Sequence, residues 1–409
     1  MDFSTYTPIY VRAGGSDSGN GSTIPLAVAT AQHAFNLALT GAGNFVLDFD
    51  AHTYAFVTLA ADWPARIAMR GAGATISALG GISGQGAAGI GDDPAQNGFN
   101  ITIVSDGTIN LGDINVSGGD GEGFGGTGGN IRISDSIVGD VSSQGGMGFG
   151  WAGSGGDVTL SNSTSGAITT SGGDHSGDHG GAVTLSHSTS GAITTDGGGG
   201  GQGSYGGDVV LTLSTAGNIS AQGGYGSGGP NAADGGAVVL THSTSGDIIT
   251  DGGEGFWMSI PNHGGDVTLS TSTAGDISAA GGLATLGHGG NVTLSYSESG
   301  AIMADGAKYN APGDMSYMGL PQSGYGGTIS LLHSTAGDIS SKGGYNTATD
   351  NAHQGYGGDG GSVSFINCNR SRINNTVITT GGLGSSPTSS DGFVNTTYLP
   401  SDVLGAGLL

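Results

Sequence analysis

A 19-residue frame, opened and closed by a Gly-Gly pair, recurs along the chain and constrains its fold more than any other feature. The copy that begins at Gly155 reads GGDVTLSNSTSGAITTSGG. Copies of this length begin at Gly128, Gly155, Gly180, Gly206, Gly235, Gly264, Gly289 and Gly326, and the copy at Gly289 closes on Ala307. A longer copy begins at Gly360. Repetition of one short unit predicts a solenoid, in which stacked units bury a core that none could bury alone.

Several columns of the frame hardly vary. The fourth, sixth and fourteenth positions are Val, Ile or Leu, the ninth is always Ser and the twelfth is always Gly. Apolar residues two apart, flanked by Thr, Ser or Asp, indicate a strand with one buried face. We expect the twelfth residue to let the chain turn and the serines to form a hydrogen-bonded ladder at a corner. The frame therefore predicts an all-β fold, a β-solenoid of the right-handed β-helix kind.

The segments between frames vary from 6 to 18 residues while the frame keeps its length. Insertions that leave a scaffold at one equivalent corner behave in this way, so we expect loops aligned along one edge. The chain has 89 glycines, and some segments are glycine-rich enough to pack as polyglycine-II strands instead. A flexible Gly/Ser linker would explain the composition but not the fixed columns.

Aromatic residues concentrate in these variable segments, which hold 12 of the 26 in the chain. Exposed loops normally favour small polar residues, so large rings there indicate contact with a partner. The alternative is that the rings fold back and cover the glycine backbone. The predicted receptor-contact residues are Phe149, Trp151, Tyr205, Tyr225, Phe256, Trp257, Tyr309, Tyr317, Tyr325, Tyr345 and Tyr356.

Composition limits the partners. The net charge of −24, with 8 basic against 32 acidic residues, would repel nucleic acid and acidic membranes, whereas neutral glycans and calcium are compatible. The single Cys368 excludes an intrachain disulfide framework. We expect no membrane insertion, because no run of about 18 apolar residues occurs, and no conventional signal peptide in the opening residues.

Residues 1–90 differ from the repeats, and we divide the chain into this region, a solenoid over 91–382 and a cap or tail over 383–409. The stretch 24–39 has a helical pattern, and the flanking segments 9–22, 45–56 and 66–71 read as strands and a polar turn. A helix there would cap the open end of the solenoid core.

This region resembles the N-terminal cap of right-handed β-helices in phage tail fibres and tailspikes, in which a strand, a Gly/Asp/Ser-rich loop, a short helix and a strand ending near GTY follow one another. The matching residues are Tyr10 to Gly21, Ala27 to Leu39 and Phe45 to Tyr54, with His52 in the glycine place. The resemblance implies that the N-terminal region joins other fibre or tail proteins.

The Gly-Gly-framed segments resemble the distal tail-fibre adhesins of T-even-like phages, in which variable loops choose the host receptor. The repeat GGDVTLSTSTAGDISAAGG is also similar to repeats of filamentous-haemagglutinin-type adhesins, but we expect a secretion signal and a longer chain in those. The phage resemblance implies a non-enzymatic receptor-binding protein of the virion or the extracellular space. It would bind a host glycan or an outer-membrane protein, without a cofactor, and a homotrimer is compatible with it.

Other functions have weaker support. The segment 174–179, with two Asp and two His, could bind a metal. The recurrent acids Asp157, Asp208, Asp266, Asp247, Asp276 and Asp338 could form a calcium ladder, although the calcium β-roll nonapeptide does not recur.

An enzyme or an ice-binding protein is the remaining alternative. A polysaccharide-cleaving tailspike would need paired carboxylates, for which the candidates are Asp48 with Asp50 and Asp106 with Asp113. An ice-binding solenoid would present a regular threonine face. The fifth-position column contains Thr159, Thr184, Thr268 and Thr293 but is interrupted by Val210, Val239, Ser330 and Ser364.

Overall fold

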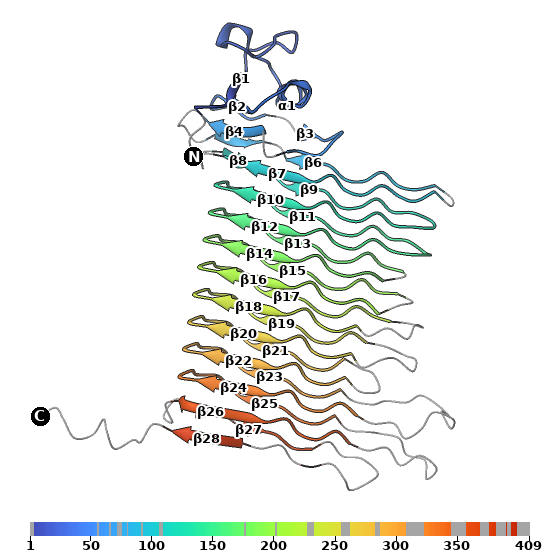
Figure 1. Cartoon of the computed structure of the whole chain (residues 1–409), viewed down its shortest axis with the longest axis vertical. Helices are drawn as coiled ribbons and strands as arrows, with labels where there is room; N and C mark the ends of the chain where they lie inside the picture. The colour runs from blue at the N-terminus through green and yellow to red at the C-terminus, as the bar shows by residue number, and fades with distance from the viewer. Residues whose placement is uncertain are drawn as a thin grey trace, which may run out of the picture. The chain divides into compact units, whose positions relative to one another are not determined.

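The computed structural model describes residues 4–54, 57–64, 67–71, 76–79, 81–90, 93–105, 109–175, 177–200, 203–226, 233–254, 262–282, 287–307, 323–344, 357–368, 376–381, 390 and 394–398. Within these ranges the fold is mostly β, and its two long sheets are all parallel, which confirms the predicted β-solenoid (Figure 1). From residue 101 to residue 378 each coil gives one strand to each long sheet.

The first long sheet has 11 strands among the described residues. In chain order they are β7 (Ile101–Val104), β10 (Ile131–Ser134), β12 (Val158–Ser161), β14 (Val183–Ser186), β16 (Val209–Thr212), β18 (Val238–Thr241), β20 (Val267–Ser270), β22 (Val292–Ser295), β24 (Ile329–Leu332), β26 (Val363–Cys368) and β28 (Val394–Tyr398).

The second long sheet has 12 short strands in the same part of the chain. They are β3 (Val57–Thr58), β6 (Ile82–Ser83), β9 (Ile114–Asn115), β11 (Val141–Ser142), β13 (Ile168–Thr169), β15 (Ile193–Thr194), β17 (Ile219–Ser220), β19 (Ile248–Ile249), β21 (Ile277–Ser278), β23 (Ile302–Met303), β25 (Ile339–Ser340) and β27 (Val377–Ile378).

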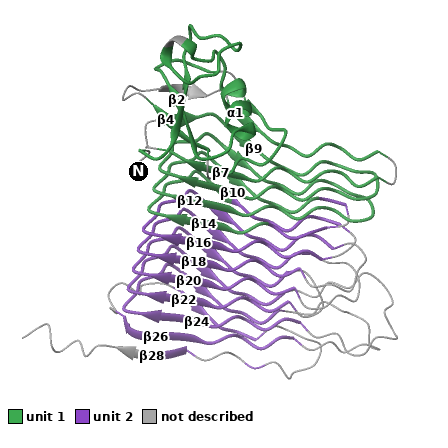
Figure 2. Ribbon diagram, turned by 45° about the horizontal axis from the view of Figure 1, so that its top comes forward, with its two compact units in different colours: residues 1–173, 181–193 green, residues 174–180, 194–409 purple. Residues whose placement is uncertain are grey.

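The chain forms two compact units, coloured separately in Figure 2: residues 1–173 with 181–193, and residues 174–180 with 194–409. We call them unit 1 and unit 2. Unit 1 holds the N-terminal region and the first coils, and unit 2 holds the later coils.

The apolar columns form the core of both units, as predicted. In unit 1, Val158 and Leu160 are fully buried and lie in register with Val183 and Leu185 of the next coil. The serine ladder also exists. The backbone N–H of Ser163 donates to the Oγ of Ser188 at 3.2 Å, while the Ser163 hydroxyl donates to a carbonyl two residues earlier. Like residues on successive coils therefore close the core and its corner.

The chain bends at each twelfth-position glycine, as predicted, although none of these glycines adopts positive φ. A Cβ at Gly166 would lie 2.1 Å from the Asp140 carboxylate of the preceding coil, so these glycines also permit close approach of the coils. A further turn, which was not predicted, directly follows each four-residue strand. It comes from the eighth residue, which has φ between +48° and +53° in every frame and is never glycine. These residues are Asp135, Asn162, His187, Leu213, His242, Thr271, Tyr296, His333 and Asn367.

Left-handed backbone costs roughly 1–2 kcal/mol for most residues but less for Asn. Leu213 has φ +50° and a half-exposed side chain. We expect Leu213→Asn to raise the free energy of unfolding by about 0.5–1 kcal/mol, measured by urea denaturation. The reciprocal change Asn162→Leu, at φ +48°, should lower it. Destabilisation by Leu213→Asn would show that the leucine packs rather than strains.

The N-terminal region contains a three-stranded parallel sheet of β1 (Thr7–Val11), β2 (Phe45–Phe49) and β4 (Ile67–Gly71). A separate pair joins β5 (Ile76–Leu79) to β8 (Ile109–Leu111). The helix α1 (Ala31–Thr40) packs against β1, β2, β3 and β4. Its buried Phe35 contacts the ring of Trp63, with ring centroids 4.5 Å apart.

The helix is shorter than the predicted 24–39. Ile24–Leu26 form the 3-10 turn η1, and Val28 then pairs with Val11 beside β1. The chain is extended there, so α1 begins only after Thr30, whose Oγ1 accepts a hydrogen bond from the His33 N–H at 3.1 Å.

Candidate functional site

The described parts of the variable segments lie at the distal ends of paired extensions, which we call legs. The outgoing leg follows the two-residue strand of a coil, and the return leg leads to the next four-residue strand. In Figure 1 the legs are the wavy traces beside the sheets. The prediction of one insertion position per coil is therefore confirmed for the described residues, but the proximal parts of the legs are ordered layers rather than loops.

Successive amides in a leg donate in three directions. In unit 1, Gly145 donates to the outgoing leg of the next coil at 2.9 Å, and Gly146 donates to a return leg at 2.8 Å. Met147, the third residue, donates outward to the Asp120 carboxylate of the preceding coil at 2.8 Å. A repeat of three residues without local hydrogen bonds is typical of polyproline-II-like chains. The legs thus have the hydrogen bonding of polyglycine II, the second architecture considered above.

This packing explains the recurrent Gly-Gly-x pattern. A Cβ at Gly145 would lie 1.7 Å from the Gly153 carbonyl oxygen, and one at Gly146 would lie 1.9 Å from that of Gly119. Gly145 and Gly146 must therefore be glycine, because they face neighbouring backbone. Other inward leg positions hold glycine or a buried residue such as Ala152, or Ser204 in unit 2. The third position faces outward and accepts a large side chain.

The outward positions of unit 1 carry large apolar side chains near the leg ends. Phe149 is 72% exposed and Trp151 is 60% exposed. Phe124 and Met147 are also exposed, and the backbones of Phe124 and Trp151 pair on adjacent coils. These rings do not fold back over the glycines. Sequence reasoning omitted Phe124 from the contact residues, although it lies in a variable segment like the others.

In unit 2 the residue that directly precedes each Gly-Gly pair forms an outward column, which we call the pre-glycine column. Its rings contact each other from coil to coil. His263 stacks on His288 and His288 on Tyr325, each at 4.7 Å between centroids, and the His179 ring is tilted by 33° against that of Tyr205 at 4.9 Å. The predicted Tyr205 and Tyr325 are exposed, as is Tyr225 on an outgoing leg.

Of the histidines of this column, His179 belongs to the predicted metal segment 174–179, whereas His263 and His288 were not predicted as site residues. Each accepts a backbone hydrogen bond through Nδ1: His179 from Tyr205 at 3.0 Å, His263 from His288 at 3.1 Å and His288 from Tyr325 at 2.8 Å. Burial, followed by the charge of His263, lowers the pKa of His288 below its ordinary value. Their position directly before a Gly-Gly pair was the one sequence feature that could have marked these histidines as a column.

The other predicted contact residues lie outside the described residues. They are Phe256, Trp257, Tyr309, Tyr317, Tyr345 and Tyr356. The described contact residues are therefore Phe149 and Trp151 of unit 1, with Phe124 added, and Tyr205, Tyr225 and Tyr325 of unit 2. Together they are called the recognition surface, with each unit considered by itself.

The acidic columns act as backbone acceptors. Asp157 accepts from the amide of Ala182, one coil later, at 2.9 Å, and Asp208, Asp266, Asp247, Asp276 and Asp338 accept in the same way at 2.7–2.9 Å. Asp174 of the predicted metal segment accepts from Gly199. Among the described residues, no group of three or more His, Cys, Asp or Glu is arranged to hold a metal ion.

The candidate carboxylate pair of the N-terminal sheet has structural partners. Asp48 is buried and bonds the guanidinium groups of Arg12 at 3.0 Å and Arg70 at 2.5 Å. Asp50 accepts from the Tyr54 hydroxyl, and burial with this hydrogen bond raises the pKa of Tyr54. Of the second pair, Asp106 lies outside the described residues and Asp113 accepts from the Asp140 amide.

The fifth-position threonines face outward from the first long sheet. Thr184 and Thr293 are exposed, and Thr159 and Thr268 are half-buried. Val210 and Val239 lie in register in the same column, so the threonine face is interrupted as the sequence indicates.

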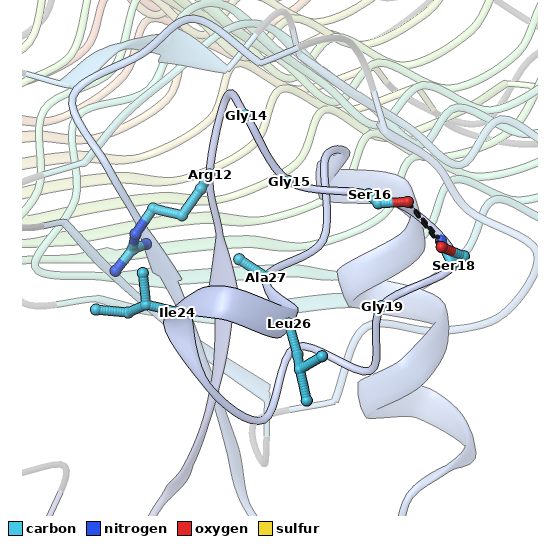
Figure 3. Close-up of a pocket in the computed structure, with 9 residues that line it drawn as sticks. All are labelled: Arg12, Gly14, Gly15, Ser16, Ser18, Gly19, Ile24, Leu26 and Ala27. Carbon is cyan, nitrogen blue, oxygen red and sulfur yellow. Dashed lines mark hydrogen bonds between the residues drawn. The ribbon is translucent and has the colours of Figure 1, made fainter.

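A pocket of about 570 Å³ lies in the N-terminal region (Figure 3). The exposed Ile24 and Leu26 line it, together with Ser16 and Ser18, whose hydroxyls bond each other at 2.8 Å. Arg12 also lines it but is bound to Asp48. The pocket therefore presents mainly apolar side chains and backbone, and it contains none of the predicted contact residues.

Comparison with known proteins gives no relative: no protein-family model and no curated protein matches the sequence. Within the part of the chain that the structure describes, neither helix has the length and apolarity to span a membrane.

Proposed function

We propose that this protein is a non-enzymatic receptor-binding protein, an adhesin of the phage tail-fibre kind that presents leg side chains to a host-surface glycan or protein. The observation that carries this proposal is the exposure of Phe149, in the bend between two legs, and of Trp151, at an outward leg position. Inward leg positions are restricted by neighbouring backbone, whereas outward positions and bends can vary without loss of the fold. A surface whose side chains vary independently of its scaffold suits receptor choice.

The remaining features of the surface are compatible with this function. Tyrosine and tryptophan combine a large apolar area with a polar tip, and they are enriched in binding hot spots. Contacts repeated from coil to coil would add up to useful affinity even if each is weak. The N-terminal region, with its exposed Ile24 and Leu26, would attach the protein to other fibre or tail proteins of a virion or an extracellular fibre.

A double substitution tests the proposal. Phe149→Gly with Trp151→Gly removes both rings. Gly148 and Gly150 flank Phe149 and Gly150 precedes Trp151, so glycine is already accommodated in this part of the chain. We expect retention of bacterial outer-membrane vesicles, taken from a panel of strains, to fall at least tenfold, since two hot-spot side chains are each worth about 1–2 kcal/mol.

The matched control is Tyr296→Ser, which removes an aromatic side chain that is also 60% exposed but lies on the turn after a four-residue strand. It should leave vesicle retention unchanged. If the wild type is retained by no strain of the panel, or if the control loses as much binding as the double variant, the leg surface is not a receptor-binding site.

A further inference from the structure

Two tyrosines of the proposed recognition surface are held by a histidine on the preceding coil. The backbone N–H of Tyr205 donates to His179 Nδ1 at 3.0 Å, and that of Tyr325 donates to His288 Nδ1 at 2.8 Å. The His288 and Tyr325 rings also stack, with centroids 4.7 Å apart, and the His179 and Tyr205 rings contact each other at 4.9 Å with a tilt of 33°. Each histidine thus contacts both the backbone and the ring of the tyrosine on the next coil.

These hydrogen bonds require unprotonated histidines. A neutral imidazole can accept at Nδ1 only when its hydrogen is on Nε2, and a protonated imidazole donates from both nitrogens and accepts at neither. Protonation would therefore place two N–H groups against each other where one hydrogen bond now exists. The outward tyrosine amide would lose its acceptor.

Asparagine and aspartate make the same hydrogen bond elsewhere in the chain, so histidine is not needed for it. In unit 1, Asn97 Oδ1 accepts from the Thr127 amide at 2.9 Å. In unit 2, Asp234 Oδ1 accepts from the His263 amide at 2.6 Å. Asparagine supplies the same acceptor and does not titrate. Where the next residue is a predicted contact tyrosine, however, the described acceptor is histidine.

Burial of the His288 ring, followed by the charge of His263, opposes protonation of His288. Its ring lies between His263 and Tyr325, and the two imidazole planes are 14° apart. Asp234 precedes His263 in the column, and Asp266, three residues after His263, is bound to Asn291. The folded-state pKa of His288 is lowered from 6.5. The stability due to its neutral form is therefore present above this pH and is lost as the pH falls through the lower folded-state value.

The charged groups around His179 are aspartates. Asp178 accepts from the His179 amide at 2.8 Å, and Asp174 accepts from Gly199 on the outgoing leg. Tyr205 follows in the column, and Asp208, three residues later, accepts from Ala237. His179 therefore accepts the same kind of hydrogen bond as His288, but aspartate carboxylates are the charged groups near it.

We propose that His179 and His288 are positioning residues for Tyr205 and Tyr325, and that their protonation in weakly acidic solution releases these tyrosines and weakens receptor binding. The regulatory part rests on the proposed receptor-binding function, whereas the positioning part does not. The device would couple recognition to the pH at the host surface.

Amide hydrogen exchange of the whole chain tests the positioning step without a receptor. The readout is the protection factor, which corrects for the intrinsic effect of pH on exchange. Between pH 7.5 and pH 5 we expect the Tyr325 amide of the wild type to lose about tenfold in protection, the ratio that one hydrogen bond gives. In His288→Asn, which keeps an acceptor, protection should stay constant.

The Thr127 amide, bound to Asn97, is the internal control and should not change. Equal behaviour of Tyr325 in the wild type and in His288→Asn would overturn the positioning role. A thermal melt of His288→Asn at pH 7.5 verifies that the variant is folded, and His288→Gln provides a second non-titrating acceptor if it is not.

Vesicle retention at pH 7.5 and pH 5 tests the regulatory step. Wild-type retention should fall at pH 5, and the double variant His179→Asn with His288→Asn should keep its binding at both values. If both proteins lose retention equally at pH 5, the histidines do not regulate binding. If the wild type retains no vesicles at pH 7.5, the receptor-binding function fails, while the exchange result still decides the positioning role.

Discussion

Replacing Gly153 with alanine is expected to destabilise unit 1 by about 3–5 kcal/mol, a large effect for one methyl group. The added Cβ would lie 1.9 Å from the Gly126 carbonyl oxygen and 2.4 Å from its carbon. Both are backbone atoms of the preceding coil, so no side chain can move aside. Overpacking costs about 1–3 kcal/mol, and separation of the legs would weaken neighbouring hydrogen bonds worth about 1 kcal/mol each.

Those hydrogen bonds join three coils. Gly153 donates to Gly146 at 2.9 Å and accepts from Gly173 at 2.8 Å, and Gly146 donates to Gly126 at 2.8 Å. A shift of one leg therefore propagates to its neighbours. We would measure the change as the midpoint of urea unfolding, with hydrogen exchange of the leg amides to locate the damage.

Ser154→Ala is the matched control. Ser154 directly follows Gly153, but it faces outward and already has a Cβ. Its effect should stay within about 0.5 kcal/mol. If Gly153→Ala is equally mild, the legs are looser than their hydrogen bonding indicates, and glycine would be needed there for flexibility rather than for close packing.

The sequence predicted the core better than the legs, for a physical reason. Val158, Leu160 and Ile168 alternate with polar residues over a few positions, so their burial follows from local periodicity. The glycines of the legs showed no local pattern beyond their abundance. The atoms that prevent a side chain at these positions belong to the backbone of another coil. Polyglycine-II packing therefore remained one of two alternatives until the neighbours were in place.

Two other features could not be predicted because no single residue type marks them. The turning residue is Leu213 in one frame and Tyr296 in another, so the column looks variable although its backbone angle is constant. The acidic columns satisfy amides 25 to 38 residues away, as Asp157, Asp247 and Asp338 do. Such a bond leaves no local pattern, and the same spacing reads equally well as a calcium ladder.

Exposure of the contact residues was predictable only in part. A ring in a glycine-rich segment can face outward or cover the backbone, and the choice depends on its place in the three-residue repeat. Trp151 and Ser154 are three residues apart and both face outward. The histidines before Gly-Gly occupy the same series, and their acceptor role depends on the amide of the next coil.

Replacing Asp48 with asparagine is expected to lower the free energy of unfolding by about 2–4 kcal/mol. The Asp48 side chain is 10% exposed, and it neutralises Arg12 and Arg70, which are 19% and 36% exposed. Removal of one member of a buried ion pair typically costs about 3–5 kcal/mol, because the partner charge stays buried. The partial exposure of Arg70 reduces this cost, since water can solvate its guanidinium.

Asp50→Asn is the informative comparison. Asp48 and Asp50 together were the carboxylate pair that the sequence offered for a glycosidase. The amide oxygen of asparagine can still accept from the Tyr54 hydroxyl, so the cost should be about 1 kcal/mol or less. A catalytic pair would behave differently: both substitutions would abolish release of reducing sugar from host polysaccharide, with little difference in stability. Thermal melts and a reducing-sugar assay on the two variants therefore separate a structural ion-pair cluster from a catalytic site. A strong loss of stability confined to Asp48→Asn, without sugar release by the wild type, would favour the receptor-binding function over the enzymatic one.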